Sequence, residues 1–172
     1  MKRFLLPVIM MFVLASESVY ADFVRLPFIG DDQQLIPRFL LLVLVFMTAY
    51  VNQSFAITYG FIFGLLYDIN YTDLLGVYMF GFAGICYLTS KAFKVLQTNA
   101  LVVIFISVLA VCVLEFYQYG VQMLIRPEIM PFHQFVLERL LPTLGLNAVA
   151  GILLIYPFKA FFTSLKKELR EE

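Results

Sequence analysis

The stretch GFIFGLLYDINYTDLLG, residues 60–76, is the most informative part of this 172-residue chain. It begins as an apolar run, reaches an aspartate, and passes through a short polar loop to a second apolar run. Ala56, Gly60, Gly64 and Asp68 recur every four residues, so they share one face of a helix. A face of small residues, here a GxxxG pattern, lets two helices approach closely. The neighbour can be another helix of the same bundle or the helix of a partner protein, and the pattern leaves both alternatives open.

The rest of the chain is as apolar as this stretch. Hydrophobic residues make up 62% of the sequence and charged residues 14%, with a mean hydropathy of +0.91. Soluble domains average roughly 45–50% apolar and about 25% charged residues, and a chain of this length lacks the interior to bury the surplus. The composition excludes a soluble enzyme, a disordered tail and a secreted disulfide scaffold. It indicates an all-α integral membrane protein.

Six apolar runs predict six membrane helices, at residues 4–20, 36–51, 55–67, 74–90, 99–122 and 136–158. Read as one helix, residues 36–67 would extend about 48 Å, which is too long for a hydrocarbon core of about 30 Å. A tight hairpin through Asn52, Gln53 and Ser54 is therefore expected between the second and third helices. The expected fold is a six-transmembrane-helix bundle forming one polytopic domain, residues 1–172.

The basic residues predict the orientation of this bundle. With both termini cytoplasmic, eight of the twelve Lys and Arg residues lie inside: Lys2, Arg3, Lys91, Lys94, Lys159, Lys166, Lys167 and Arg170. The other four lie outside: Arg25, Arg38, Arg126 and Arg139. This bias agrees with the positive-inside rule and predicts a multi-pass protein of the cell membrane. Because the chain has no Trp, its tyrosines, Tyr67 among them, are expected at the two interfaces.

Both ends of the chain leave an alternative open. The first run is expected to be a retained helix, although Val19-Tyr20-Ala21 resembles a signal-peptide cleavage site. The tail, residues 159–172, alternates apolar and basic residues at helical spacing. It is expected to be a cytoplasmic amphipathic segment, either lying at the inner headgroups or continuing the sixth helix into water.

Polar residues at membrane depth are expensive and usually face partners or cavities. Five charged residues fall in the outer half of the predicted spans: Glu17, Arg38, Asp68, Glu115 and Arg139. We expect the bundle to gather them into one outer-side polar cluster, with the two arginines as counter-ions. The alternative is that residues at helix ends snorkel separately to water. Asn147 lies near the middle of the sixth span and is expected to hydrogen-bond another helix.

The sequence predicts no enzyme. His133 is the only histidine, and Cys86 and Cys112 lie in separate apolar runs, so no metal site of familiar spacing is present. The G-x-S-x-G, HExxH and P-loop motifs are absent. Tyr67-Asp68 resembles the YD of intramembrane aspartyl proteases, but no second intramembrane aspartate accompanies it. We therefore expect no catalytic residues, no metal and no cofactor, and the balanced charge does not suggest nucleic acid.

The central stretch resembles the core signature of MreD, a family of rod-shape-determining membrane proteins. The matching positions are Gly64, Leu65, Asp68, Leu75 and Gly76. The later segment from Arg139 to Asn147, RLLPTLGLN, is similar to the family's last helix. The whole chain fits the family's length and span count, in the version found in Bacillus-like rods. This resemblance adds Leu75 and Gly76 to Ala56, Gly60, Gly64 and Asp68 as helix-packing or partner-contact candidates.

The resemblance implies a non-enzymatic scaffold subunit of the cell-elongation (Rod) complex. Such a subunit supports sidewall peptidoglycan synthesis and rod cell shape through MreC, the glycosyltransferase RodA, a class B penicillin-binding protein and MreB filaments. It also implies a fold similar to the substrate-binding subunit of energy-coupling-factor transporters. That similarity provides the alternative function, a six-helix vitamin-binding transport subunit. The two differ in whether a small vitamin or a single-span protein co-purifies.

Overall fold

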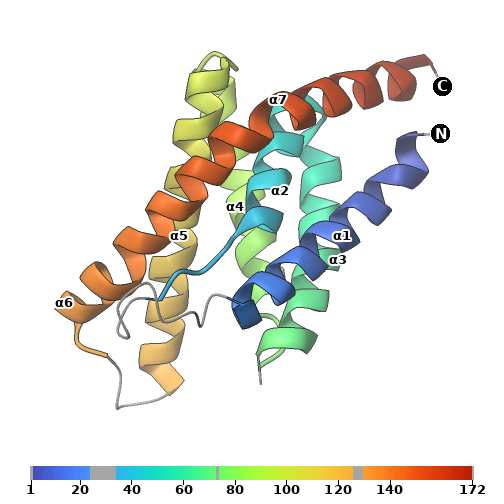
Figure 1. Cartoon of the computed structure of the whole chain (residues 1–172). Coiled ribbons are helices and arrows are strands. Elements are labelled where there is room, and N and C mark those ends of the chain that lie inside the picture. Colours follow the sequence, from blue (N-terminus) through green and yellow to red (C-terminus); the bar gives the residue numbers. More distant parts are fainter. Residues whose placement is uncertain (1, 24–33, 73, 126–129, 172) are drawn as a thin grey trace.

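The computed structural model describes residues 2–23, 34–72, 74–125 and 130–171. These residues form helices and connections, without a β-strand among them. The elements are α1 Lys2–Phe23, α2 Phe39–Tyr50, α3 Gln53–Tyr71, α4 Val77–Val95, α5 Ala100–Ile125, α6 Phe132–Gln134, the π-helical turn η1 Phe135–Leu140, and α7 Leu141–Glu171 (Figure 1).

The chain runs back and forth between two ends of the bundle. The start of α1, the α2–α3 turn, the α4–α5 connection and the end of α7 lie toward one end, which is the top of Figure 1. The α3–α4 loop and the start of α6 lie toward the other end. Two helical segments are long and apolar enough to cross a membrane, namely Ala100–Ile125 with 26 residues and Phe132–Arg170 with 39 residues.

The second helix, α2, forms the core of the bundle. It packs against α1, α3, α4, α5 and α7, and every residue from Leu40 to Met47 is buried. This enclosure explains why its sequence, FLLLVLVFMTAY, is apolar on all sides rather than along one stripe.

Helix α2 is shorter than the predicted span 36–51, because residues 34–38 form a non-helical segment that precedes it. Pro37 explains part of this difference, since a proline favours an extended conformation in the residue before it. Twelve helical residues cover about 18 Å. This length is shorter than a hydrocarbon core of about 30 Å.

The other boundaries differ less from the sequence prediction. The turn between α2 and α3 is shorter than the expected three-residue hairpin, because α3 already begins at Gln53 after its N-cap Asn52. The tail of the chain continues α7 to Glu171. This continuation agrees with the second alternative for residues 159–172. Phe162 and Leu165 in the tail are fully buried against the bundle, so one face of the continued helix packs on the protein.

Candidate functional site

Arg38 lies at the centre of a buried polar cluster, where the non-helical segment 34–38 meets the start of α2. Its Nε donates to Glu115 Oε1 at 2.8 Å, and its Nη2 lies 2.7 Å from the same oxygen. Nη2 also donates to Gln118 Oε1 at 2.6 Å. Nη1 donates to the hydroxyl oxygens of Tyr67 at 3.1 Å and Tyr78 at 2.9 Å. Arg38 is only 2% exposed, so these contacts replace its water shell.

Glu115 joins a second arginine to the first. Its Oε2 accepts a hydrogen bond from Arg139 Nε at 2.9 Å, and Arg139 Nη2 donates to Gln118 Oε1 at 3.2 Å. Glu115 and Gln118 are one turn apart on α5, so one helix face presents both acceptors. Arg139 comes from the π-helical turn η1. The cluster Arg38–Glu115–Gln118–Arg139 therefore ties α2, α5 and η1 together.

Glu17 approaches the same region from α1. Its Oε1 accepts a hydrogen bond from the backbone N–H of Leu40 at 2.5 Å, which satisfies a free donor in the first turn of α2. A negative group at this position also interacts favourably with the helix dipole. Its second oxygen has no hydrogen-bond partner within the described part of the chain. Glu17 thus reaches the start of α2 without forming an ion pair with either arginine.

Asn147 joins segment 34–38 to α7 by hydrogen bonds. Its Oδ1 accepts from the backbone N–H of Arg38 at 2.8 Å, and its Nδ2 donates to the carbonyl of Ile36 at 3.0 Å. Thr143, one turn earlier, accepts from the N–H of Ile36 at 3.3 Å. Non-helical backbone in a buried or half-buried position needs such partners. The partner of Asn147 is therefore a non-helical segment, whereas the sequence suggested another helix.

Asp68 does not join the arginines, which corrects the expectation that all five outer charges form one cluster. Its carboxylate accepts hydrogen bonds from the backbone N–H groups of Gly76 at 2.9 Å, Tyr78 at 2.8 Å and Met79 at 3.1 Å. These are donors at the start of α4, so Asp68 caps that helix from the end of α3. Gly76 has a φ of +108°, a conformation that glycine adopts without steric cost.

The small residues of α3 face α4. A Cβ built on Gly64 would lie 2.6 Å from the Cα of Met79, and one built on Gly60 would lie 3.3 Å from the backbone nitrogen of Ala83. Ala56 on the same face is fully buried. In this structure the stripe is occupied by a neighbouring helix of the same chain. Leu75 is 72% exposed beside it.

The sequence analysis missed several polar partners. It placed Tyr67 in an interfacial belt, whereas the tyrosine is buried beside Arg38. It did not single out Tyr78, Gln118 or Thr143 as site residues. The position of Gln118, one turn after Glu115, was a usable signal, because both must share a face of α5. Tyr78 had no such signal, because its contact depends on how α4 packs.

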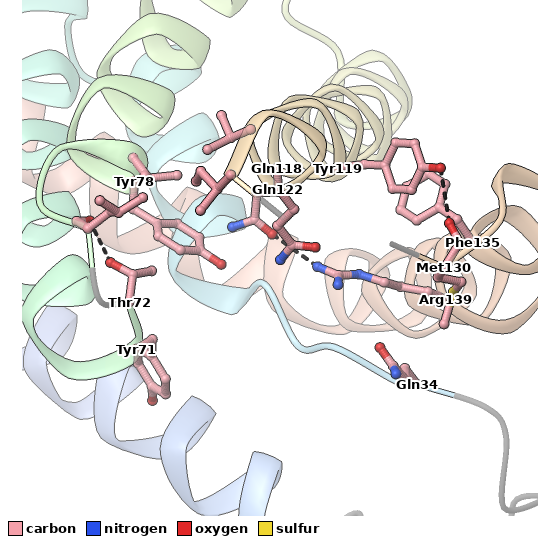
Figure 2. Close-up of a pocket in the computed structure, with 14 residues that line it drawn as sticks. Gln34, Tyr71, Thr72, Tyr78, Gln118, Tyr119, Gln122, Met130, Phe135 and Arg139 are labelled. Carbon is pink, nitrogen blue, oxygen red and sulfur yellow. Dashed lines mark hydrogen bonds between the residues drawn. The ribbon is translucent and has the colours of Figure 1, made fainter. Parts of the chain in front are cut away.

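A pocket of about 470 Å³ lies beside the cluster, between the α3–α4 loop, the end of α5 and η1. Figure 2 shows Arg139, Gln118 and Gln122 close together in this pocket, with Tyr78 to one side and Gln34 to the other. Within the described residues, no group of three or more His, Cys, Asp and Glu side chains is arranged to hold a metal ion. The chemistry available here is hydrogen bonding and charge pairing.

Comparison with known proteins identifies the family. The family described as "rod shape-determining protein MreD" matches residues 2–165. The chain belongs to the MreD family. It is 64% identical to the Rod shape-determining protein MreD of Bacillus subtilis (strain 168), over all 172 residues of this chain and the full length of that protein. The resemblance noted in the sequence is thereby confirmed. No solved structure matches the chain.

The residues that suggested the MreD family lie in two places. Gly64, Asp68 and Gly76 form the contact between α3 and α4. Arg139 and Asn147 hold the other side of the bundle, through Glu115 and the backbone of Arg38. These five residues therefore make contacts within the chain itself, whereas Leu65 and Leu75 of the same signature are exposed.

Proposed function

We propose that this chain is a non-enzymatic membrane scaffold of the cell-elongation complex, acting in sidewall peptidoglycan synthesis and rod cell shape. The observation that carries the proposal is the 64% identity to a rod shape-determining protein across the full length of both chains. The buried charges support it, because their contacts join helices to one another. Such contacts stabilise one bundle geometry on which partner proteins can assemble.

The proposal includes a single membrane domain with six spans and both termini in the cytoplasm. Two observations support it: the chain alternates between two ends of the bundle (Figure 1), and both termini lie toward the same end. Lys91 and Lys94 fall in the last two turns of α4, toward the end where α7 also finishes. Basic residues at the end of the bundle where α7 finishes agree with a cytoplasmic location for that end.

Labelling of introduced cysteines tests this topology. In a variant whose two native cysteines are replaced by alanine, Gln97→Cys should be protected from an impermeant reagent in intact cells. His133→Cys should be labelled. Both side chains are exposed, so reactivity reports the side of the membrane. Labelling of Gln97→Cys from outside would contradict the proposed orientation.

The proposed partners are the single-span protein MreC and, through it, RodA, a class B penicillin-binding protein and MreB filaments. These assignments rest on family membership. A pull-down of the tagged protein from native membranes in mild detergent should recover MreC with the synthase. Depletion should make rod cells round and swollen. Cells that remain rods on depletion, in a strain without a second copy of the gene, would contradict the proposed function.

A further inference from the structure

The pocket beside the cluster has a lining that scaffold packing alone does not require. Its polar lining includes the guanidinium of Arg139 and the amides of Gln34, Gln118 and Gln122, and its apolar lining includes Val121. Among the described lining residues there is no carboxylate. At about 470 Å³ the pocket falls within the roughly 300–1,000 Å³ typical of small-molecule sites.

Arg139 has bonding capacity directed at this pocket. In the described part of the chain its Nε donates to Glu115 and its Nη2 to Gln118, and no hydrogen bond involves Nη1. The side chain of Arg139 is 15% exposed, whereas that of Glu115 is fully buried. A molecule in the pocket therefore meets the guanidinium and not the carboxylate.

Among the described residues that line the pocket, the charged group is the guanidinium of Arg139. Within the same part of the chain, Arg38 and Arg139 both pair with Glu115. Two further described carboxylates accept hydrogen bonds outside the pocket, Glu17 at the start of α2 and Asp68 at the start of α4. A partly exposed guanidinium favours an anionic occupant, because its planar fork suits a phosphate or carboxylate group.

We propose that this pocket binds an anionic, hydroxyl-bearing group of the phosphoglycerol type, with the phosphate at Arg139 and the hydroxyls on the glutamine amides. Two sources carry this chemistry, the headgroup of an anionic phospholipid and a free glycerol phosphate. The apolar lining residues Val77, Val121 and Ile125 favour the lipid, because they can cover the first carbons of an acyl chain. The inference goes beyond the proposed function and does not depend on any partner protein.

Native mass spectrometry of the purified full-length protein in a neutral detergent tests this proposal. The probes are dioleoyl-phosphatidylglycerol, dioleoyl-phosphatidylcholine and sn-glycerol 3-phosphate, each titrated separately. We expect one phosphatidylglycerol per protein, bound about tenfold more tightly than phosphatidylcholine, which corresponds to about 1.4 kcal/mol. Binding of glycerol phosphate as tight as that of phosphatidylglycerol would support the phosphoglycerol site and identify the free glycerol phosphate as its source. Equal binding of both lipids without binding of glycerol phosphate would overturn the proposal.

Two variants with a matched control locate the binding. Val121→Trp fills the pocket and Gln122→Leu removes an amide from its lining, and each should weaken phosphatidylglycerol binding about tenfold. Leu124→Trp is the control, because Leu124 lies on the same turns of α5 but is 90% exposed and outside the lining. Phosphatidylglycerol binding that survives both pocket variants, or that Leu124→Trp weakens equally, would overturn the proposal.

Discussion

The contact between α3 and α4 and the cluster Arg38–Glu115–Gln118–Arg139 hold this bundle together in opposite ways. The first joins helices that are adjacent in the chain, through backbone proximity at Gly64 and a carboxylate cap from Asp68. The second joins segments far apart in the chain, since Arg38 is 77 residues from Glu115. The α3–α4 contact depends on the absence of side-chain volume, whereas the cluster depends on charge.

This difference shows how two kinds of buried polar group are stabilised. Asp68 lies in the last turn of α3 and accepts hydrogen bonds from backbone donors at the start of α4, without a counter-ion among the described residues. Glu115 lies within α5, where the backbone donors are already used, so it requires arginines from elsewhere in the chain. For Asp68 and Glu115, the donors within reach thus decide whether the buried carboxylate acts as a cap or as half of an ion pair.

The largest effect should follow from removing the shared carboxylate. Glu115→Leu leaves two arginines without their acceptor in a buried site, and breaking a buried pair in this way costs about 3–5 kcal/mol. We expect failure to accumulate in membranes, or a large drop in the thermal midpoint in detergent. Glu138→Gln is the control, because within the described residues Glu138 accepts a hydrogen bond from the N–H of Gln34 through its backbone carbonyl rather than its carboxylate. Equal stability of the two variants would show that the cluster contributes little to the fold.

The next effect should come from adding volume to the α3–α4 contact. Gly64→Ala places a methyl group 2.6 Å from the Cα of Met79, so the backbones must separate, at about 1–3 kcal/mol. Gly60→Ala should cost less, because its nearest atom lies at 3.3 Å. Gly84→Ala is the control, with nothing within 4 Å. The thermal midpoints in detergent should rank Gly64→Ala lowest and Gly84→Ala unchanged, and a different order would contradict this packing.

The two regions also differ in how far the sequence could predict them. The spacing of Ala56, Gly60 and Gly64 indicated a close helix contact, because four-residue periodicity is local. The polar cluster was predicted in outline, with Arg38 and Arg139 as counter-ions to buried acids. The sequence could not show which acids would pair, because that depends on how helices distant in sequence pack. Asp68 was misassigned for this reason.

The non-helical conformation of segment 34–38 could also not be predicted from the sequence pattern. An apolar run that opens with Pro37 is compatible with the first turn of a helix, and the prediction began the helix at residue 36. The conformation observed depends on hydrogen bonds that the backbone N–H groups of Ile36 and Arg38 donate to Thr143 and Asn147, which lie more than a hundred residues away. Tertiary contacts therefore decided a local conformation that periodicity alone assigned to a helix.

An intermediate effect is expected for the cap at Asp68. Asp68→Ala leaves three backbone N–H groups at the start of α4 without acceptors, at about 1–3 kcal/mol. Asp68→Asn should be milder, since its amide keeps one acceptor oxygen. The thermal midpoints in detergent should therefore fall in the order wild type, Asn, Ala. If charge pairing rather than capping were the role of Asp68, the two variants would be equally damaging, as both remove the negative charge.

The smallest loss of stability should come from removing the uncharged hydrogen bonds that Asn147 and Thr143 make with segment 34–38. Asn147→Leu keeps the side-chain size but removes the acceptor of the Arg38 N–H and the donor to the Ile36 carbonyl. Polar contacts between membrane segments average about 0.6 kcal/mol and reach about 1.7 kcal/mol, so we expect a loss of about 1–2 kcal/mol for this double contact. Thr143→Val should cost about 0.5 kcal/mol, because its bond to the Ile36 N–H is long, at 3.3 Å. Hydrogen exchange of the backbone amide of Arg38 should accelerate in Asn147→Leu, while the amides of α4 keep their protection. A loss as large as that of Glu115→Leu would mean that Asn147 also positions the side chain of Arg38, since Asn147 accepts a hydrogen bond from the Arg38 backbone N–H. The contacts of Asn147 and the charged cluster would then form one cooperative unit, and the α3–α4 contact would be independent of that unit.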